Sequence, residues 1–270
     1  GVRGEQRRYR GEAGARDFDL ISGSASAFVK PVQGVRLSLS LAKTERAPTE
    51  VELFANGPHA ATQAFEIGNP TLAKEAATSL ELGISWRFKE WRAHVDVWQA
   101  EFDGFIGFAP NGEEEDGLAI YEVSQKDATL RGHEFGLSGP LWVGTAAQIS
   151  ADVTGDYVRG RQKGGAFIAR MPPPQVTLGL EAQWAKLKAR VEAQRLDSQK
   201  KLAAFETPTS GANIYNVRLS WQPLGDGDGI ALVLEGNNLT DALVREHSSF
   251  LKDSVPKPGR SLKLSLHAKF

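Results

Sequence analysis

Apolar and polar residues alternate strictly along most of the chain, a pattern typical of β-strands with one apolar and one polar face. In 80–88, for example, apolar residues occupy the even positions and polar or small residues the odd ones. The same period of two recurs in about twelve segments, near 2–9, 17–30, 35–41, 80–88, 91–97, 127–138, 147–153, 176–184, 187–193, 215–221, 230–234 and 262–270. The pattern therefore predicts an all-β protein with about twelve strands.

Short and long connections between these strands alternate along the chain. Short turns are expected at 30–34, 89–90, 139–142, 185–186 and 223–229, and long loops at 10–16, 46–75, 104–118, 159–173, 199–211 and 242–258. An up-and-down barrel of an outer membrane has short turns on one side and long loops on the other. A Greek-key sandwich has no reason to keep this order. We therefore expect a transmembrane antiparallel up-and-down β-barrel.

Aromatic residues and the polar faces of the strands fit the same interpretation. The last alternating segment closes on Phe270, as the final strand of an outer-membrane barrel commonly does. Five of the six tryptophans lie near the expected short turns, where an interfacial girdle would place them: Trp86, Trp91, Trp142, Trp184 and Trp221. One side of 186–194 carries only charged and amide side chains, which a wide, water-filled interior tolerates better than a packed core.

Composition narrows the classes of function. The formal net charge of −1 argues against a nucleic-acid surface, which would show a clustered basic excess. The chain has no cysteine, so disulfide frameworks and thiolate metal sites are excluded. It starts Gly1-Val2-Arg3 inside an expected strand, so we expect residues 1–270 to be the carboxyl-terminal portion of one barrel domain from a longer, exported precursor.

Several short motifs resemble those of one family. Residues 46–49 read Arg-Ala-Pro-Thr and are followed by Glu-Leu, and residues 68–72 read Gly-Asn-Pro-Thr-Leu before the next strand. Two further segments, Glu-Gly-Asn-Asn-Leu-Thr-Asp at 235–241 and Pro-Lys-Pro-Gly-Arg at 256–260, precede the closing strand. In order and character these segments resemble the barrel of TonB-dependent outer-membrane receptors, over most of 17–270.

This resemblance implies a total of 22 strands in the whole barrel, about twelve of them in this chain. It implies that the plug domain and the signal peptide are absent from this sequence, as are about ten strands. The implied function is energy-dependent uptake of a scarce solute across the bacterial outer membrane, without catalysis. The implied partners are outer-membrane lipid, a small solute or metal, and the TonB energy-transducing complex, which would dock on the missing amino-terminal region; no nucleic acid is expected.

Candidate substrate-binding residues lie in the long loops. The stretch Phe54–Thr62 looks most like the branch of the family associated with zinc uptake, and His59, Glu52 and Glu66 could supply nitrogen and oxygen ligands. His59 and Glu66 are the expected metal ligands, with zinc as transported substrate rather than cofactor. His247 in another loop could join them across the barrel mouth. The alternative is that His59 is a turn residue and the carboxylates are solvated.

Other interpretations remain open at this stage. The acidic run 113–116 is expected to be a solvated loop tip. A small closed porin or autotransporter translocator would also suit twelve strands. A barrel hydrolase would need a serine, a histidine and an orienting group on one face, for which His133 with Ser124 or Ser138 is a candidate without a surrounding motif.

Overall fold

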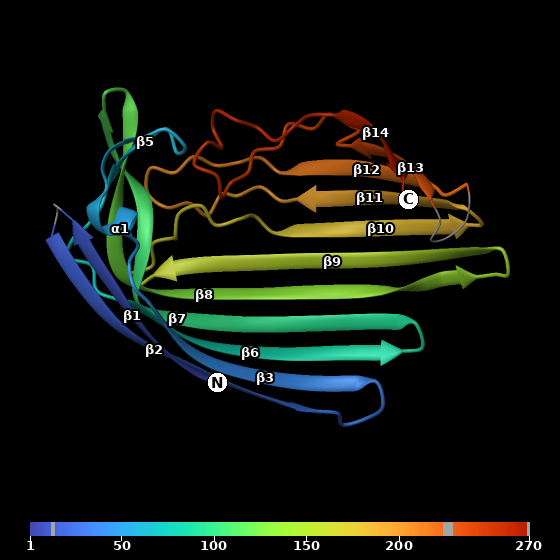
Figure 1. The fold of residues 1–270 in the computed structure, drawn as a ribbon, viewed down its shortest axis with the longest axis horizontal. Helices are drawn as coiled ribbons and strands as arrows, with labels where there is room; N and C mark the ends of the chain where they lie inside the picture. Colours follow the sequence, from blue (N-terminus) through green and yellow to red (C-terminus); the bar gives the residue numbers. More distant parts are fainter. Residues whose placement is uncertain (12–13, 224–228, 269–270) are drawn as a thin grey trace.

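Twelve strands form one antiparallel meander in which each strand pairs with the next along the chain (Figure 1). The computed structural model describes residues 1–11, 14–223 and 229–268. The strands are β1 (Val2–Gly11), β2 (Gly14–Val29), β3 (Val35–Arg46), β6 (Glu75–Phe88), β7 (Trp91–Glu115), β8 (Leu118–Val143), β9 (Ala147–Gln162), β10 (Gln175–Trp184), β11 (Leu187–Leu196), β12 (Ala212–Trp221), β13 (Ile230–Asn237) and β14 (Ser261–Ala268). The predicted strand number and up-and-down order are confirmed. Within the described residues β1 and β14 each pair on one side only, so the sheet is open.

Short turns lie at one end of the sheet and long connections at the other, as the alternating loop lengths predict (Figure 1). Three expected boundaries are wrong. The expected long loop 10–16 is mostly strand, because β1 and β2 stay paired up to Gly11 and Gly14. Residues 139–142 do not turn but continue β8 across a register irregularity, and the turn follows Val143. The expected loop 104–118 is instead the outer part of the β7–β8 hairpin, whose strands stay paired up to Glu115 and Leu118. The acidic run is at the tip of this hairpin, and the turn expected at 223–229 falls largely outside the described residues.

The two faces of the sheet differ in chemistry. The apolar face carries large exposed side chains that continue across neighbouring strands, such as Leu219, Leu234 and Leu264 on three successive strands. These side chains are 37%, 38% and 67% exposed, respectively. The polar face carries ion pairs between strands, including Arg190–Asp152 at 2.6 Å and Lys188–Glu181 at 2.8 Å. A surface of exposed leucines, valines and tryptophans on this scale is typical of contact with lipid.

Five tryptophans flank the short turns, as predicted, and four of them are strongly exposed: Trp86, Trp142, Trp184 and Trp221. Trp98 lies away from the turns on the polar face, where its ring covers Gly132. The predicted closing strand is β14, although Lys269 and Phe270 lie outside the described residues. Among the described residues, no helix is long and apolar enough to cross a membrane.

The buried core lies at the loop end of the molecule. The long connection between β3 and β6 folds into α1 (Glu50–Phe54), β4 (Asn56–His59) and β5 (Ala64–Ile67), and β5 pairs in parallel with β8. Leu53 is fully buried and Leu72 is 1% exposed, packed with Phe18, Leu20, Ile106 and Val123. The connection expected to be a simple loop is thus a small folded unit seated on the sheet.

Candidate functional site at the loop end

Helix α1 is fixed by a reciprocal capping box. The Thr49 hydroxyl accepts a bond from the Glu52 backbone N–H at 3.2 Å, and Glu52 Oε2 accepts from the Thr49 N–H at 2.7 Å. Glu52 Oε2 also lies 2.8 Å from Arg46 Nη1. Such a box satisfies two backbone donors that a helix start otherwise leaves free. Glu52 is therefore engaged in holding the Arg-Ala-Pro-Thr segment.

The Gly-Asn-Pro segment closes this unit from the other side. The N–H groups of Gly68 and Asn69 donate to the carbonyls of Ala55 and Glu52 at 2.7 and 2.8 Å. A Cβ on Gly68 would lie 2.8 Å from three backbone atoms of residues 53–55. Because backbone cannot yield as a flexible side chain can, only glycine fits here. Both halves of the motif thus meet around α1.

His59 and Glu66 are brought together in the β4–β5 hairpin. His59 Nδ1 lies 2.9 Å from Glu66 Oε1, and the Thr62 hydroxyl donates to the same oxygen at 2.7 Å. The Glu66 side chain is 5% exposed, whereas that of His59 is 53% exposed. A carboxylate buried under a half-exposed imidazole offers one nitrogen and one oxygen ligand, and a closed zinc site needs more.

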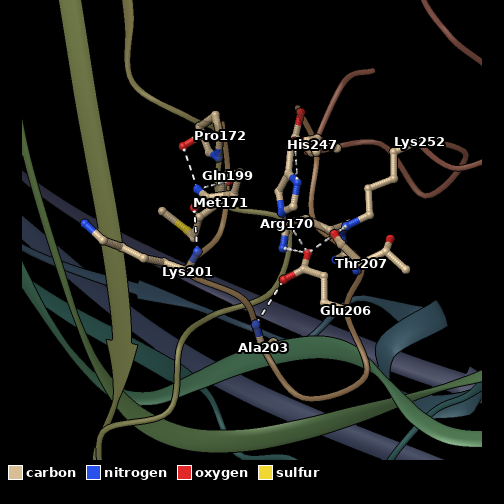
Figure 2. A network of polar contacts seen from close by, with 12 residues as sticks. Arg170, Met171, Pro172, Gln199, Lys201, Ala203, Glu206, Thr207, His247 and Lys252 are labelled. Carbon is tan, nitrogen blue, oxygen red and sulfur yellow. Dashed lines mark hydrogen bonds and ion pairs between the residues drawn. The ribbon is translucent and has the colours of Figure 1, made fainter. Parts of the chain in front are cut away.

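His247 lies in a buried polar network that joins three long connections (Figure 2). Its Nδ1 is 2.9 Å from the Thr209 hydroxyl, and its Nε2 is 3.2 Å from Glu206 Oε1. The contact between His247 Nε2 and Glu206 Oε1 is short, but its geometry does not meet that of a hydrogen bond, so the two groups interact electrostatically. His247 is 1% exposed and does not open onto solvent.

Glu206 is the centre of this network. Its carboxylate accepts backbone N–H bonds from Arg170 at 2.7 Å and Ala203 at 3.0 Å, and Lys252 Nζ lies 3.4 Å away (Figure 2). Burial by itself raises the pKa of Glu206. The contact with His247, the two backbone bonds and the Lys252 charge outweigh it and bring the pKa down to about 2. The loops are therefore held together by a buried carboxylate that is charged at neutral pH.

An aromatic cluster connects this network to the β7–β8 hairpin. The Arg170 guanidinium lies 3.9 Å from the ring centroid of Phe250 and donates to the Phe108 carbonyl at 2.8 Å. Tyr121 and Phe250 are 5.2 Å apart between ring centroids. Burial lowers the pKa of Arg170 below its ordinary value. A cleft of about 380 Å³ opens beside this cluster, lined in part by Glu52, Phe108 and Arg170.

The structure thus places the four sequence candidates at one end of the sheet but in separate contacts. The segments that carry Glu66 and His247 are linked indirectly. Glu66 on β5 is paired with Tyr121 on β8, and the Tyr121 ring contacts that of Phe250, three residues after His247. His59 is nevertheless paired with Glu66, and His247 with Glu206. Substrate contact by these residues stays a prediction. Sequence reasoning missed Arg170, Glu206 and Phe250, because no local motif joins residues so far apart in the chain.

The sequence matches the family described as TonB dependent receptor-like, beta-barrel, over residues 1–239. The chain belongs to this family. The match covers both halves of the motif around α1 and extends to Leu239 in the turn after β13. It confirms the resemblance of the chain to TonB-dependent receptors.

Solved structures of three transporters or receptors share the fold of this family member. The copper transporter OprC is 19% identical, with a TM-score of 0.77, over 93% of this chain and 40% of that one. The FrpB iron transporter from Neisseria meningitidis (F5-1 variant) is 16% identical, with a TM-score of 0.72, over 100% of this chain and 42% of that one. The siderophore receptor PirA from Pseudomonas aeruginosa is 17% identical, with a TM-score of 0.59, over 93% and 44%. The chain spans about two fifths of the length of these proteins.

The hydrolase alternative finds no support in the geometry. His133 lies on the apolar face of β8, where its ring is 5.3 Å from that of Tyr157. Ser124 and Ser138 are an odd number of residues away on the same strand, so they point to the opposite face. A serine and a histidine on opposite faces of one strand cannot form a nucleophile–base pair.

Proposed function

We propose that residues 1–270 form the carboxyl-terminal portion of a receptor barrel in the bacterial outer membrane that takes up a metal ion or metal chelate. In this proposal the remaining strands complete a barrel of about 22 and a plug domain fills it. The plug region would couple uptake to the TonB complex. The protein acts by binding and gated transport, without catalysis.

Membership of the family and the two faces of the sheet support the location. The apolar face, with its exposed leucines and its tryptophans at the short turns, suits outer-membrane lipid. The polar face suits a water-filled or plug-filled interior. Because relatives of the same fold are more than twice as long as this chain, we infer that the whole protein carries the additional strands.

The folded loop end is the observation that carries the receptor proposal. A passive pore needs no buried core in its loops, yet here one helix, two short strands and a buried polar network are built at the mouth. His59 and Glu66 provide a nitrogen and an oxygen on one side, with Glu52 and His247 as further candidates. Zinc accepts both ligand types, and the substrates named for the structural relatives, copper, iron and siderophores, belong to the same class of scarce metals and chelates.

Uptake by intact cells tests this proposal. Cells that produce the full gene product would be given radiolabelled Zn²⁺ or a labelled ferric chelate, with and without a functional TonB complex. We expect accumulation of one of the two that stops when TonB is removed. The double variant His59→Ala/Glu66→Gln should lower zinc accumulation at least tenfold if zinc is the substrate, and leave chelate uptake unchanged.

Accumulation that continues without TonB would instead favour the porin or translocator alternative. Failure of both substrates in cells with an assembled, heat-modifiable barrel would contradict the metal proposal and point to an organic nutrient.

A further inference from the structure

A second group of metal-ligating side chains lies away from the loops, on the polar face of β7 and β8. His94 and Asp96 on β7 and Glu134 on β8 each offer one ligand atom, and these atoms all lie within 4.8 Å of one another. Asp96 and Glu134 are directly opposite each other in the antiparallel register, and His94 is one pleat closer to the short turn. The group is thus built by two neighbouring strands in the rigid part of the sheet.

The charges of this group are arranged differently from the ion pairs of β9 to β13 on the same polar face. On β9 to β13 acidic and basic side chains meet across strands, as in Arg190–Asp152 at 2.6 Å and Arg218–Glu235 at 2.5 Å. Asp96 and Glu134 place two carboxylates in register, and Asp156 faces Glu134 from β9. Within the described part of the chain none of these three carboxylates has an ion-pair partner. Like charges directly opposite each other destabilise a sheet unless a cation lies between them.

Glycines beside the group leave room for its side chains to lie over the sheet. Gly136 is opposite His94, and a Cβ there would lie 2.3 Å from His94 Cε1. Gly83 is opposite Asp96 on β6, and a Cβ there would lie 2.3 Å from Asp96 Oδ1. The imidazole and the carboxylate therefore lie over these glycines, where an added Cβ would force them to rotate away.

We propose that His94, Asp96 and Glu134 bind a divalent transition-metal ion, with Zn²⁺ as the ion whose preferences they fit best. One imidazole and two carboxylates are a ligand set that zinc accepts, with water completing an open site. Ligand atoms around a tetrahedral zinc are about 3.4 Å apart, so closure needs a shift of about 1 Å. His94 and Glu134 are exposed and Asp96 is only partly buried, so small rotations supply this shift. The site is on the barrel wall, independent of the loop site and of whether zinc is transported.

Metal binding by the purified full gene product in detergent tests this site. The experiment uses a His59→Ala background, which removes the loop candidate, and measures Zn²⁺ stoichiometry by equilibrium dialysis and Co²⁺ binding by its ligand-field absorption. We expect His94→Gln and Glu134→Gln each to lose one bound equivalent or to weaken it at least tenfold. Asp156→Asn removes the same charge one strand away without removing a ligand, and should keep that equivalent.

Two outcomes would overturn the proposal. If His94→Gln and Glu134→Gln bind as much metal as the background, these residues are not ligands. If Asp156→Asn loses as much as Glu134→Gln, the polar face only accumulates cations electrostatically. Heat-modifiable migration of every variant shows that the barrel is folded. Uptake is not the readout, so failure here leaves the proposed receptor function standing.

Discussion

The strand region and the loop end of this protein follow opposite rules of burial. In the strand region the large apolar side chains point outward and are exposed, as Leu39 at 40% and Leu82 at 48%. At the loop end Leu53 and Leu72 are buried, and so are the charged side chains of Glu206 and Lys252. The exposed apolar face of the first region suits lipid, whereas the second has a buried core like that of a small water-soluble domain. One chain thus meets two solvents, and the same residue type has a different role in each.

Because the two regions depend on different interactions, we expect that the loop end can be loosened without unfolding the strand region. We also expect that the strand region can be destabilised while the loop end stays folded. Four changes should separate the two regions, with effects that decrease from the first to the last.

Removing a buried leucine should affect only the loop end. Leu53→Ala leaves a cavity among Phe18, Ile106 and Val123, for which we expect a cost of about 2–5 kcal/mol in local stability. Protease cleavage within 50–75 on intact cells should accelerate, while heat-modifiable migration of the barrel stays unchanged. The matched variant Leu41→Ala, on the exposed apolar face, should leave the loop protected. Equal cleavage in both variants would contradict the separation of the two regions.

Placing a charge on the lipid-facing side should affect only the strand region. Leu39→Arg lies within the apolar stripe of β3, and a basic residue near the middle of a bilayer costs about 2–4 kcal/mol. Ser40→Arg puts the same side chain on the opposite face, where water and acidic groups can receive it. Unfolding in urea from lipid vesicles should show a lower midpoint for Leu39→Arg only. A larger loss for Ser40→Arg would mean that the faces have been assigned the wrong way round.

Acid should release the loop network. The pKa of Glu206 is lowered from about 4.5 to about 2 in the fold, so its contribution is complete above pH 4.5 and disappears as the pH falls toward 2. A shift of this size corresponds to a contribution on the order of 3 kcal/mol. Pepsin should therefore cut 197–211 increasingly over this range in the native protein. Glu206→Gln should be cut at a rate that depends less on pH.

The matched control for this experiment is Glu246→Gln. The pKa of Glu246 is also lowered, chiefly by Lys257, but its side chain is 41% exposed, so a smaller effect on cleavage is expected. Equal effects of the two variants would show that burial of Glu206 adds nothing.

The smallest effect is expected at His59. The ring is half exposed, and Thr62 continues to hold Glu66 when the imidazole is removed, so His59→Asn should cost less than about 1 kcal/mol. Protease protection of the β4–β5 hairpin should be nearly unchanged. A large loss of protection would assign His59 a structural role and weaken its candidacy as a substrate ligand.

The strand region could be predicted from the sequence because its physics is local. Alternation in segments such as 80–88 specifies both the strand and its apolar face, and all twelve predicted strands are present. The positions of the turns were predicted less well than the strands. Gly139-Pro140 has the composition of a turn, yet these residues pair with β9 and β8 continues beyond them. The hairpin 104–118 was also missed, because its polar tip has the composition of a loop although its backbone stays paired.

The loop end was largely beyond prediction because its contacts are long-range. The start of α1 had a readable signal, since Thr49 and Glu52 have the spacing of a capping box. The pairing of β5 with β8 and the meeting of Arg170 with Phe250 had none. His59 and Glu66, the expected metal ligands, are in contact, but their role as ligands stays a prediction. Glu52 and His247 are instead held by Arg46 and by Glu206.

Cysteine labelling on intact cells tests the central claim most directly, because the sequence contains no cysteine of its own. Ala61→Cys lies in the exposed β4–β5 turn, and Glu90→Cys lies in the short turn between β6 and β7. If the sheet spans the outer membrane with its long connections outside, a membrane-impermeant maleimide labels Ala61→Cys on intact cells and Glu90→Cys only after the outer membrane is opened. Labelling of both positions on intact cells, or of Glu90→Cys alone, would contradict the account.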